Sequence, residues 1–319
     1  MNKFKAFVIV FILVSFKAFA CLNGETKILA NGVEVYHDDH KVVPKGHEFY
    51  KENFSKLISD LESAYKRTGD IDYLSDKGYV LIIQRKYDEA LKLYINIEKI
   101  EPHRYSTASN IGTLYELKGE NEKAYEWIKK AIKINPESHN GSEWLHLKIL
   151  EAKIKNLKNI SGTFLINTSF GLEKNPKTKL TSNELAILEK ALYYQLNERI
   201  TFIKPKDAII SVLLFELANI VKINKDDLSA TEIYELSKKY GFQNELINKR
   251  IILCYEDRLH FWGTEIEKLE IKKGSIFDLD GRQLDIIVMI LSLISLIFLV
   301  LLIVFFLKWK KLKKSITAS

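Results

Sequence analysis

The chain has 319 residues, 47% of them apolar, which is enough for one large or two medium domains with a core and excludes a disordered polymer. It contains only 5 Pro and 14 Gly, so the composition favours helices over a turn-rich β-sandwich. The formal charge of +7 arises at the two ends, and subtracting the eight lysines there leaves about −1, which excludes a strongly basic nucleic-acid-binding domain. These lysines are Lys3, Lys5, Lys17, Lys308, Lys310, Lys311, Lys313 and Lys314.

Residues 1–20 are typical of a secretory signal peptide. A basic start precedes an uncharged apolar run over residues 6–16, and Ala18 and Ala20 have the spacing of a cleavage site. At about 1.5 Å per residue, this run is too short to span a hydrocarbon layer of about 30 Å. We therefore expect the mature chain to be exported. Cys21 follows the cleavage site directly, and its lipidation is an open alternative.

Residues 21–47 are expected to form a β-hairpin and a loop. The sequence alternates around Asn31-Gly32, which is the strongest short-range signal for a β-hairpin. Three histidines follow, and because histidine is a suitable metal ligand, a metal site is one hypothesis. A solvated polar loop is the simpler interpretation, because no second set of ligands with a recognisable spacing accompanies them. The three are His37, His40 and His47.

A period of 34 residues organises the region 48–160. Small or helix-breaking residues recur at this offset, and the pairs are Gly78 and Gly112, Ala90 and Ala124, and Pro102 and Pro136. The small residues would let the two helices of a hairpin pack closely, and each Pro would end the second helix. In type and spacing these residues resemble the tetratricopeptide repeat (TPR) family. The resemblance implies a stack of helical hairpins, because one hairpin cannot bury its own apolar face.

The resemblance also implies a binding site. In TPR proteins the inner face of the first helix of each hairpin lines a concave groove that accepts a peptide or a partner helix. By repeat position, this groove would be lined here by Asp72, Ser75, Tyr79, Ile82, Ser109, Asn110, Thr113, Glu116, Glu143 and Trp144. We expect Tyr79 and Trp144 to be the anchors, because large aromatic residues often carry much of the binding energy of an interface.

Two further segments precede the C-terminal end. Residues 161–180 show little periodicity and predict a linker loop. Residues 181–275 predict a second helical region, which opens with a capping box at Thr181 and Glu184 and contains a degenerate repeat near 211–241.

The last part of the chain predicts a membrane anchor. Residues 286–307 carry no charge, and a helix of this length reaches across a hydrocarbon layer of about 30 Å. By the positive-inside rule, the lysine-rich segment 308–319 predicts a cytoplasmic tail. The expected localisation is a single-pass membrane protein with an exported N-terminal domain, either periplasmic or extracellular.

The expected fold class is therefore all-α: a tetratricopeptide-type helical-hairpin solenoid with a short N-terminal β-hairpin and one C-terminal transmembrane helix. The sequence has no Gly-rich phosphate loop, nucleophile elbow or Cys-x-x-Cys pair, so we expect neither an enzyme nor a cofactor.

The expected function is a non-catalytic protein–protein interaction scaffold on the outer side of the cytoplasmic membrane. Its partners would be a protein or peptide and the membrane itself, without nucleic acid. Two alternatives remain: a structural subunit of a membrane-embedded assembly, and a metal-binding protein that uses His37, His40 and His47.

Overall fold

The computed structural model describes residues 24–39, 42–50, 52–276, 292, 295–296 and 299. It separates into two compact units, the first ending at Arg258 and the second beginning at Leu259. The predicted signal peptide (1–20), Cys21, His40 and the predicted tail (308–319) lie outside the described residues.

A two-stranded antiparallel sheet opens the described chain. It consists of β1 (Gly24–Ile28) and β2 (Glu34–Asp39), the hairpin predicted around Asn31-Gly32. Gly32 has a φ of 83°, a conformation that glycine adopts without a steric penalty. The hairpin packs on α2 (Phe54–Thr68) and on the following helix through a small core. This core contains Leu29, Val35, Tyr36, Leu57, Leu61 and Val80.

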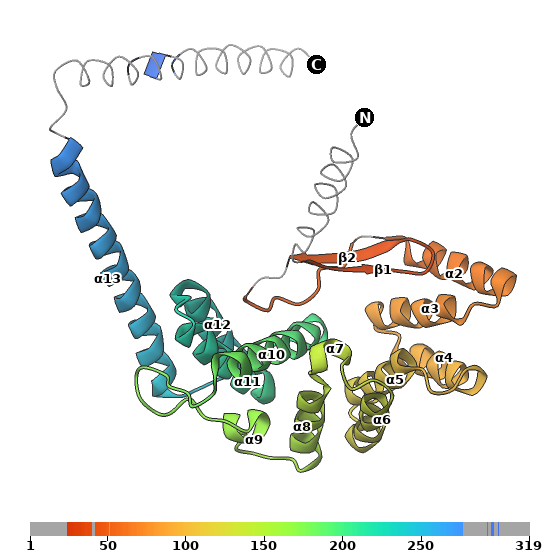
Figure 1. The fold of residues 1–319 in the computed structure, drawn as a ribbon. Coiled ribbons are helices and arrows are strands. Elements are labelled where there is room, and N and C mark those ends of the chain that lie inside the picture. Colours follow the sequence, from red (N-terminus) through yellow and green to blue (C-terminus); the bar gives the residue numbers. More distant parts are fainter. Residues whose placement is uncertain are drawn as a thin grey trace, which may run out of the picture. The chain divides into compact units, whose positions relative to one another are not determined.

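Two helical hairpins follow, and in each of them the two helices pack closely at a glycine. The first pairs α3 (Ile71–Ile83) with α4 (Tyr87–Ile100), and the second pairs α5 (Tyr105–Leu117) with α6 (Asn121–Ile134) (Figure 1). A Cβ atom on Gly78 would lie 2.6 Å from the Tyr94 ring, and one on Gly112 would lie 2.6 Å from Cδ1 of Ile128. No real Cβ atom packs this closely. Each glycine therefore permits the close approach of its two helices, as the 34-residue period predicted.

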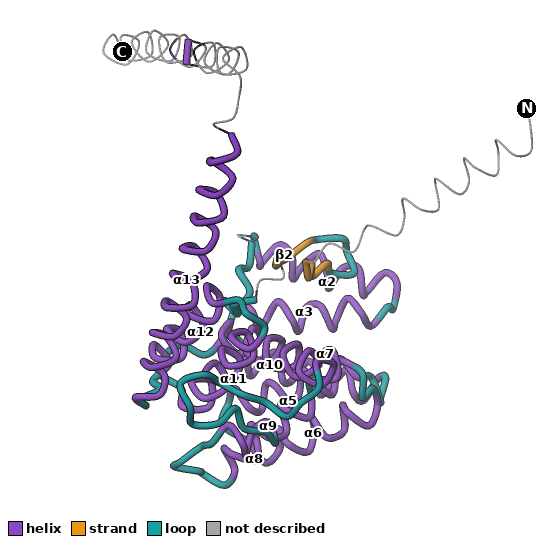
Figure 2. The backbone as a smooth tube through the Cα atoms, turned by 60° about the vertical axis from the view of Figure 1, so that its left-hand side comes forward, coloured by secondary structure: helices purple, strands orange, loops and turns teal. Residues whose placement is uncertain are grey.

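The third hairpin is incomplete. After the short α7 (Ser138–Gly141), α8 (Glu143–Ile154) packs against α6 as the first helix of a repeat. In place of a long second helix come only α9 (Gly162–Ile166) and the loops around it, drawn in teal in Figure 2. The segment 161–180 is thus more than a linker, because it contributes Leu165, Ile166 and Phe170 to the main core.

Four helices complete the fold, and they are α10 (Ser182–Phe202), α11 (Ala208–Ile223), α12 (Asp227–Tyr240) and α13 (Glu245–Ile276). The predicted capping box opens α10: the Thr181 amide donates to the Glu184 carboxylate at 2.8 Å, and the Glu184 amide donates to the Thr181 hydroxyl at 3.3 Å. α11 and α12 form a hairpin where the degenerate repeat was expected. α11 lies in the middle of the main core, which explains its almost continuous apolar sequence.

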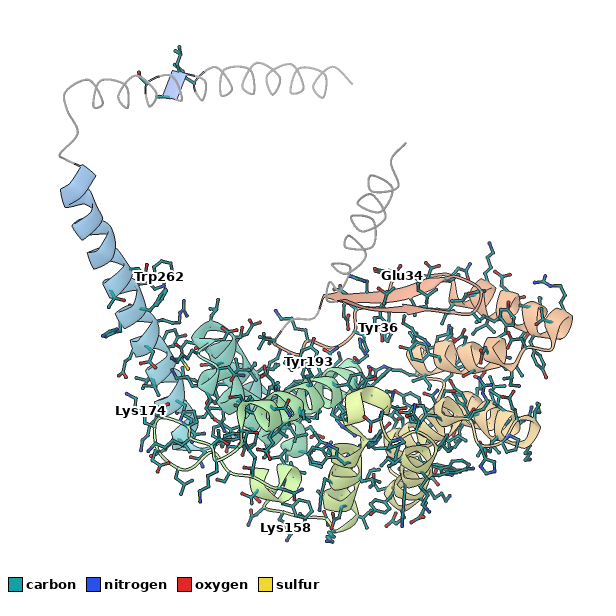
Figure 3. All side chains as sticks on the ribbon, viewed as in Figure 1. Glu34, Tyr36, Lys158, Lys174, Tyr193 and Trp262 are labelled. Carbon is teal, nitrogen blue, oxygen red and sulfur yellow. The ribbon has the colours of Figure 1, made fainter. Side chains whose placement is uncertain are left out.

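A buried arginine ties the loop after α9 to this core. Arg250 of α13 is fully buried, and its guanidinium donates to Oδ1 of Asn219 at 2.5 Å and to the carbonyl of Gly171 at 2.7 Å. At the surface, Lys174 of the same loop pairs with Glu256 at 2.5 Å (Figure 3). The loop is therefore fixed at both a buried and an exposed point.

The structure corrects the predicted transmembrane helix and, with it, the single-pass localisation. Among the described helices none is both long enough and apolar enough to cross a membrane. The longest, α13, has 32 residues but carries charges along its length, whereas the strongly apolar α11 has 16 residues and reaches only about 24 Å of the required 30 Å or so. The predicted span itself, 286–307, lies outside the described residues except at 292, 295–296 and 299.

Candidate protein-binding face

The ten residues predicted to line a groove lie on α3, α5 and α8, and their exposure differs widely. Asp72 is exposed. Five are half-buried, namely Ser75, Tyr79, Asn110, Thr113 and Trp144. Four are buried, namely Ile82, Ser109, Glu116 and Glu143. The predicted groove is therefore not one open surface.

The accessible part lies at α3 and the beginning of α5. Asp72 pairs with Arg104, the residue that precedes α5. The Tyr94 hydroxyl donates to the carbonyl of Ser75 at 2.7 Å and accepts from the Asn110 side chain at 3.1 Å. These hydrogen bonds and the ion pair thus join polar residues of α3, α4 and α5 into one connected layer.

The two predicted aromatic anchors make contacts inside the protein. Tyr79 packs against the hairpin core, with the Lys27 ammonium 5.3 Å from its ring centroid. Burial, more than any other cause, raises the pKa of the Tyr79 hydroxyl well above its ordinary value. Trp144 packs against the core of the C-terminal helices. Replacing either residue would therefore disturb folding as well as any binding.

Glu116 is the centre of a buried ionic network. Its Oε1 accepts from Nη1 of Arg199 at 2.6 Å and from Nζ of Lys153 at 2.7 Å, and its Oε2 pairs with Nε2 of His146 at 2.7 Å. Burial alone would raise the pKa of Glu116, but the charges of Arg199, His146 and Lys153 hold it well below its ordinary value. Because these partners belong to α8 and α10, the network joins α5 to both helices.

Glu143 makes a second buried network beside the first. Its Oε1 accepts from the Tyr105 hydroxyl at 2.8 Å and pairs with His139 at 2.8 Å, while its Oε2 pairs with His146 at 3.2 Å. Burial opposes ionisation, but hydrogen bonds from His139 and His146 lower the pKa of Glu143 below its ordinary value. These carboxylates hold helices together.

α10 covers the inner side of α5 and α8. In addition to the Arg199–Glu116 pair, the Gln195 amide donates to the Ser142 hydroxyl at 3.1 Å, and Tyr194 stacks on His139 with ring centroids 4.8 Å apart. A cavity of about 70 Å³ lies between α5 and α10. A helix of the same chain therefore covers this part of the predicted groove.

A further segment, residues 42–50, runs along α10, and we call it the strap. The backbone amides of Lys45 and Gly46 donate to Oδ1 of Asn197 at 3.2 and 2.8 Å, and the amide of His47 donates to the Thr201 hydroxyl at 2.8 Å. Three successive hydrogen bonds thus fix the strap on the last turns of α10.

His47 links the hairpin to α10. Its Nδ1 pairs with Asp38 at 2.5 Å, and its Nε2 pairs with Glu198 at 2.8 Å. Burial lowers the pKa of His47, but Glu198 and then Asp38 outweigh this effect and raise it to about 9. The side chain is buried, so for His47 the interpretation as part of a solvated loop is wrong.

His37 and His47, two of the three histidines of the metal-site hypothesis, do not share a common site. His37 is exposed and contacts the Thr26 hydroxyl at 2.5 Å, whereas both ring nitrogens of His47 face carboxylates, and His40 lies outside the described residues. Within residues 24–39, 42–50 and 52–276, no group of three His, Cys, Asp or Glu side chains could hold a metal ion.

An open groove of about 460 Å³ lies between the strap, the end of α10 and α12, and we call it the strap groove. No local sequence pattern indicates this groove, because its walls come from three separate segments of the chain. Apolar residues form its floor and charged residues its rim.

Comparison with known proteins finds only distant structural similarity. No family model and no curated protein matches the sequence. Solved structures with some similarity include PilF of Pseudomonas aeruginosa, with 15% identity over 68% of this chain and 84% of that one and a TM-score of 0.35. YrrB, described as a TPR protein with an unusual peptide-binding site, has 13% identity over 61% and 96% of the two chains and a TM-score of 0.30. A double mutant of MamA RS-1 has 11% identity over 59% and 84%, with a TM-score of 0.32.

Scores this low define neither a family nor a function. The class of protein follows from the helices themselves: stacked hairpins, two of which have a 34-residue period and a glycine at their close crossing, make this a TPR-like helical-repeat fold with a short β-hairpin at its beginning.

Proposed function

We propose that this chain is a non-catalytic scaffold that binds another protein through the polar face of α3 and α5. The supporting observation is the layer in which the exposed Asp72 pairs with Arg104 and Ser75 is joined to Asn110 through Tyr94. Helical repeats present such faces on rigid supports, because each repeat packs only on its neighbours and leaves an extended surface.

The ten predicted groove residues divide into two roles in this proposal. Asp72, Ser75 and Asn110 contact the partner, because they are at least partly exposed and belong to no apolar core. Thr113 lines the small cavity between α5 and α10. With Thr113, the residues that hold the face in shape are Tyr79, Ile82, Ser109, Glu116, Glu143 and Trp144. A polar partner segment suits this face, since its accessible groups are mainly hydrogen-bond donors and acceptors.

Site-specific photocrosslinking in the source cells tests the proposal. A photoreactive amino acid replaces Asp72 or Ser75 in the full-length chain, and the matched control carries it at Lys133, an exposed position on the outer helix α6. We expect a discrete protein adduct from the inner positions and none from the control. We also expect Asp72→Ala to weaken recapture of that protein by about fivefold or more. Equal adducts from all three positions, or no adduct from the inner ones, would contradict the proposal.

A further inference from the structure

We propose that the strap groove binds an acidic segment of another protein, a short stretch in which carboxylates flank one or two apolar side chains. This surface shares no residue with the polar face of α3 and α5, so the two proposals stand or fall separately.

The floor of the strap groove is apolar and already formed. It contains Val43 and Pro44 from the strap, Ile200 from α10, and Leu236 and Tyr240 from α12. The Tyr240 hydroxyl donates to the carbonyl of Ile203 at 2.9 Å, which fixes its ring as a wall. A volume of about 460 Å³ lies within the range of 300–1,000 Å³ that is usual for ligand pockets. The groove can therefore accept apolar side chains without rearrangement.

The rim of the strap groove carries more positive than negative charge that is free of ion pairs. Its two carboxylates are already neutralised, because Glu232 pairs with Lys45 at 2.8 Å and Glu235 pairs with Lys238 at 3.4 Å. Lys204 and Lys239 are exposed and have no ion pair with any residue in the described part of the chain. Two ammonium groups are thus available to a partner.

The ends of two helices oppose this charge but do not cancel it. α10 and α12 both end beside the groove, and each end carries the equivalent of about half a negative charge. Together they offset about one lysine, and Asp207, whose charge acts on Tyr240, offsets a second, whereas Lys204, Lys239 and the nearby exposed Lys206 contribute three. The remaining field is positive and favours carboxylates, while the apolar floor favours a segment that also carries an aliphatic or aromatic residue.

Fluorescence anisotropy with the full-length chain tests this proposal. The probe is a fluorescein-labelled peptide, Asp-Asp-Leu-Phe-Asp-Asp, and the comparison peptides are Lys-Lys-Leu-Phe-Lys-Lys and Asp-Asp-Ser-Ser-Asp-Asp. The variant Lys204→Glu/Lys239→Glu reverses the free charges. The control Lys158→Glu/Lys179→Glu makes the same change in net charge at exposed residues that do not line the groove (Figure 3 labels Lys158).

We expect the charge reversal to weaken binding of the acidic Leu-Phe peptide by about tenfold or more and the control to change it by less than about twofold. Both comparison peptides should bind at least about fivefold more weakly, and raising NaCl from about 50 to 300 mM should weaken the acidic peptide. Equal binding of acidic and basic peptides, equal losses in the two variants, or no saturable binding would overturn the proposal. Sedimentation velocity adds a separate outcome: a dimer that only the Lys204→Glu/Lys239→Glu variant disrupts, without peptide binding, would place a second copy in the groove instead.

Discussion

A methyl group added to Gly78 tests the close packing on which the repeat depends. Its carbon would lie 2.6 Å from Cε2 and Cζ of Tyr94 and 3.0 Å from the hydroxyl oxygen. Tyr94 is fully buried, and its hydroxyl donates to the carbonyl of Ser75 at 2.7 Å. The ring therefore cannot retreat without opening a void or breaking this hydrogen bond.

Three effects set the size of the change. Alanine is favoured over glycine in a helix interior by about 1 kcal/mol. Overpacking a core costs about 1–3 kcal/mol, and loss of the hydrogen bond made by Tyr94 costs about 1 kcal/mol more. We therefore expect Gly78→Ala to lower the free energy of unfolding by about 1–3 kcal/mol, although alanine has the higher helix propensity.

Urea denaturation of the full-length chain, followed by far-ultraviolet circular dichroism, measures this difference. The matched control is Gly263→Ala, because a Cβ there meets no atom within 4 Å, and it should leave stability unchanged or raise it. In a Tyr94→Leu background the colliding ring atoms are gone, so Gly78→Ala should cost nothing. If Gly78→Ala stabilises the protein as Gly263→Ala does, the packing argument is refuted.

Two further predictions concern pH. The pKa of His47 is raised from 6.5 to about 9, so the stabilising effect of its charge is full below about pH 6.5 and disappears as pH rises through 9. His47→Gln should therefore lower the free energy of unfolding by about 2 kcal/mol near pH 6 and by almost nothing near pH 10. Urea titrations at both pH values measure this difference. Glu216 is buried on α11, where its carboxyl accepts from the Asn219 side chain at 2.9 Å. Burial raises the pKa of Glu216 to about 7, so the neutral carboxyl is favoured in the folded state and stability is lost as pH rises from about 4.5 through 7. Glu216→Gln should thus match the parent near pH 4.5 and exceed it by about 2 kcal/mol near pH 8 in the same assay, and a pH-independent difference would contradict this assignment.

The features that sequence could predict are those with a local physical cause. Gly32 takes the positive φ that the hairpin turn requires, and Thr181 with Glu184 satisfies the free amides at a helix start. The recurrence of Gly78 and Gly112 could be recognised because a close helix crossing needs a small residue at one fixed position. Each of these signals depends only on residues within about one repeat.

The arrangement of α10 and the strap could not be predicted in this way. Lys45 meets Asn197, and Glu116 meets Arg199, across long stretches of chain that no local pattern connects. One signal was present: Gln195 lies seven residues, about two helical turns, after Leu188, so a polar residue stands on the apolar face of α10. Such a residue can indicate a buried polar partner from another element. Without the partner helix, however, the sequence does not say what covers it.

α10 is a permanent part of the fold beside α5 and α8 and cannot act as a displaceable ligand. Its large buried side chains are Leu185, Leu188, Leu192, Leu196 and Ile200. At about 1.5–3 kcal/mol each, their exposure would cost about 7–15 kcal/mol, which equals the whole stability of a typical domain. A partner that binds with micromolar affinity provides only about 8 kcal/mol. A partner is therefore expected to bind beside α10, on the polar face of α3 and α5 or in the strap groove, because removing the helix would unfold the protein that presents the site.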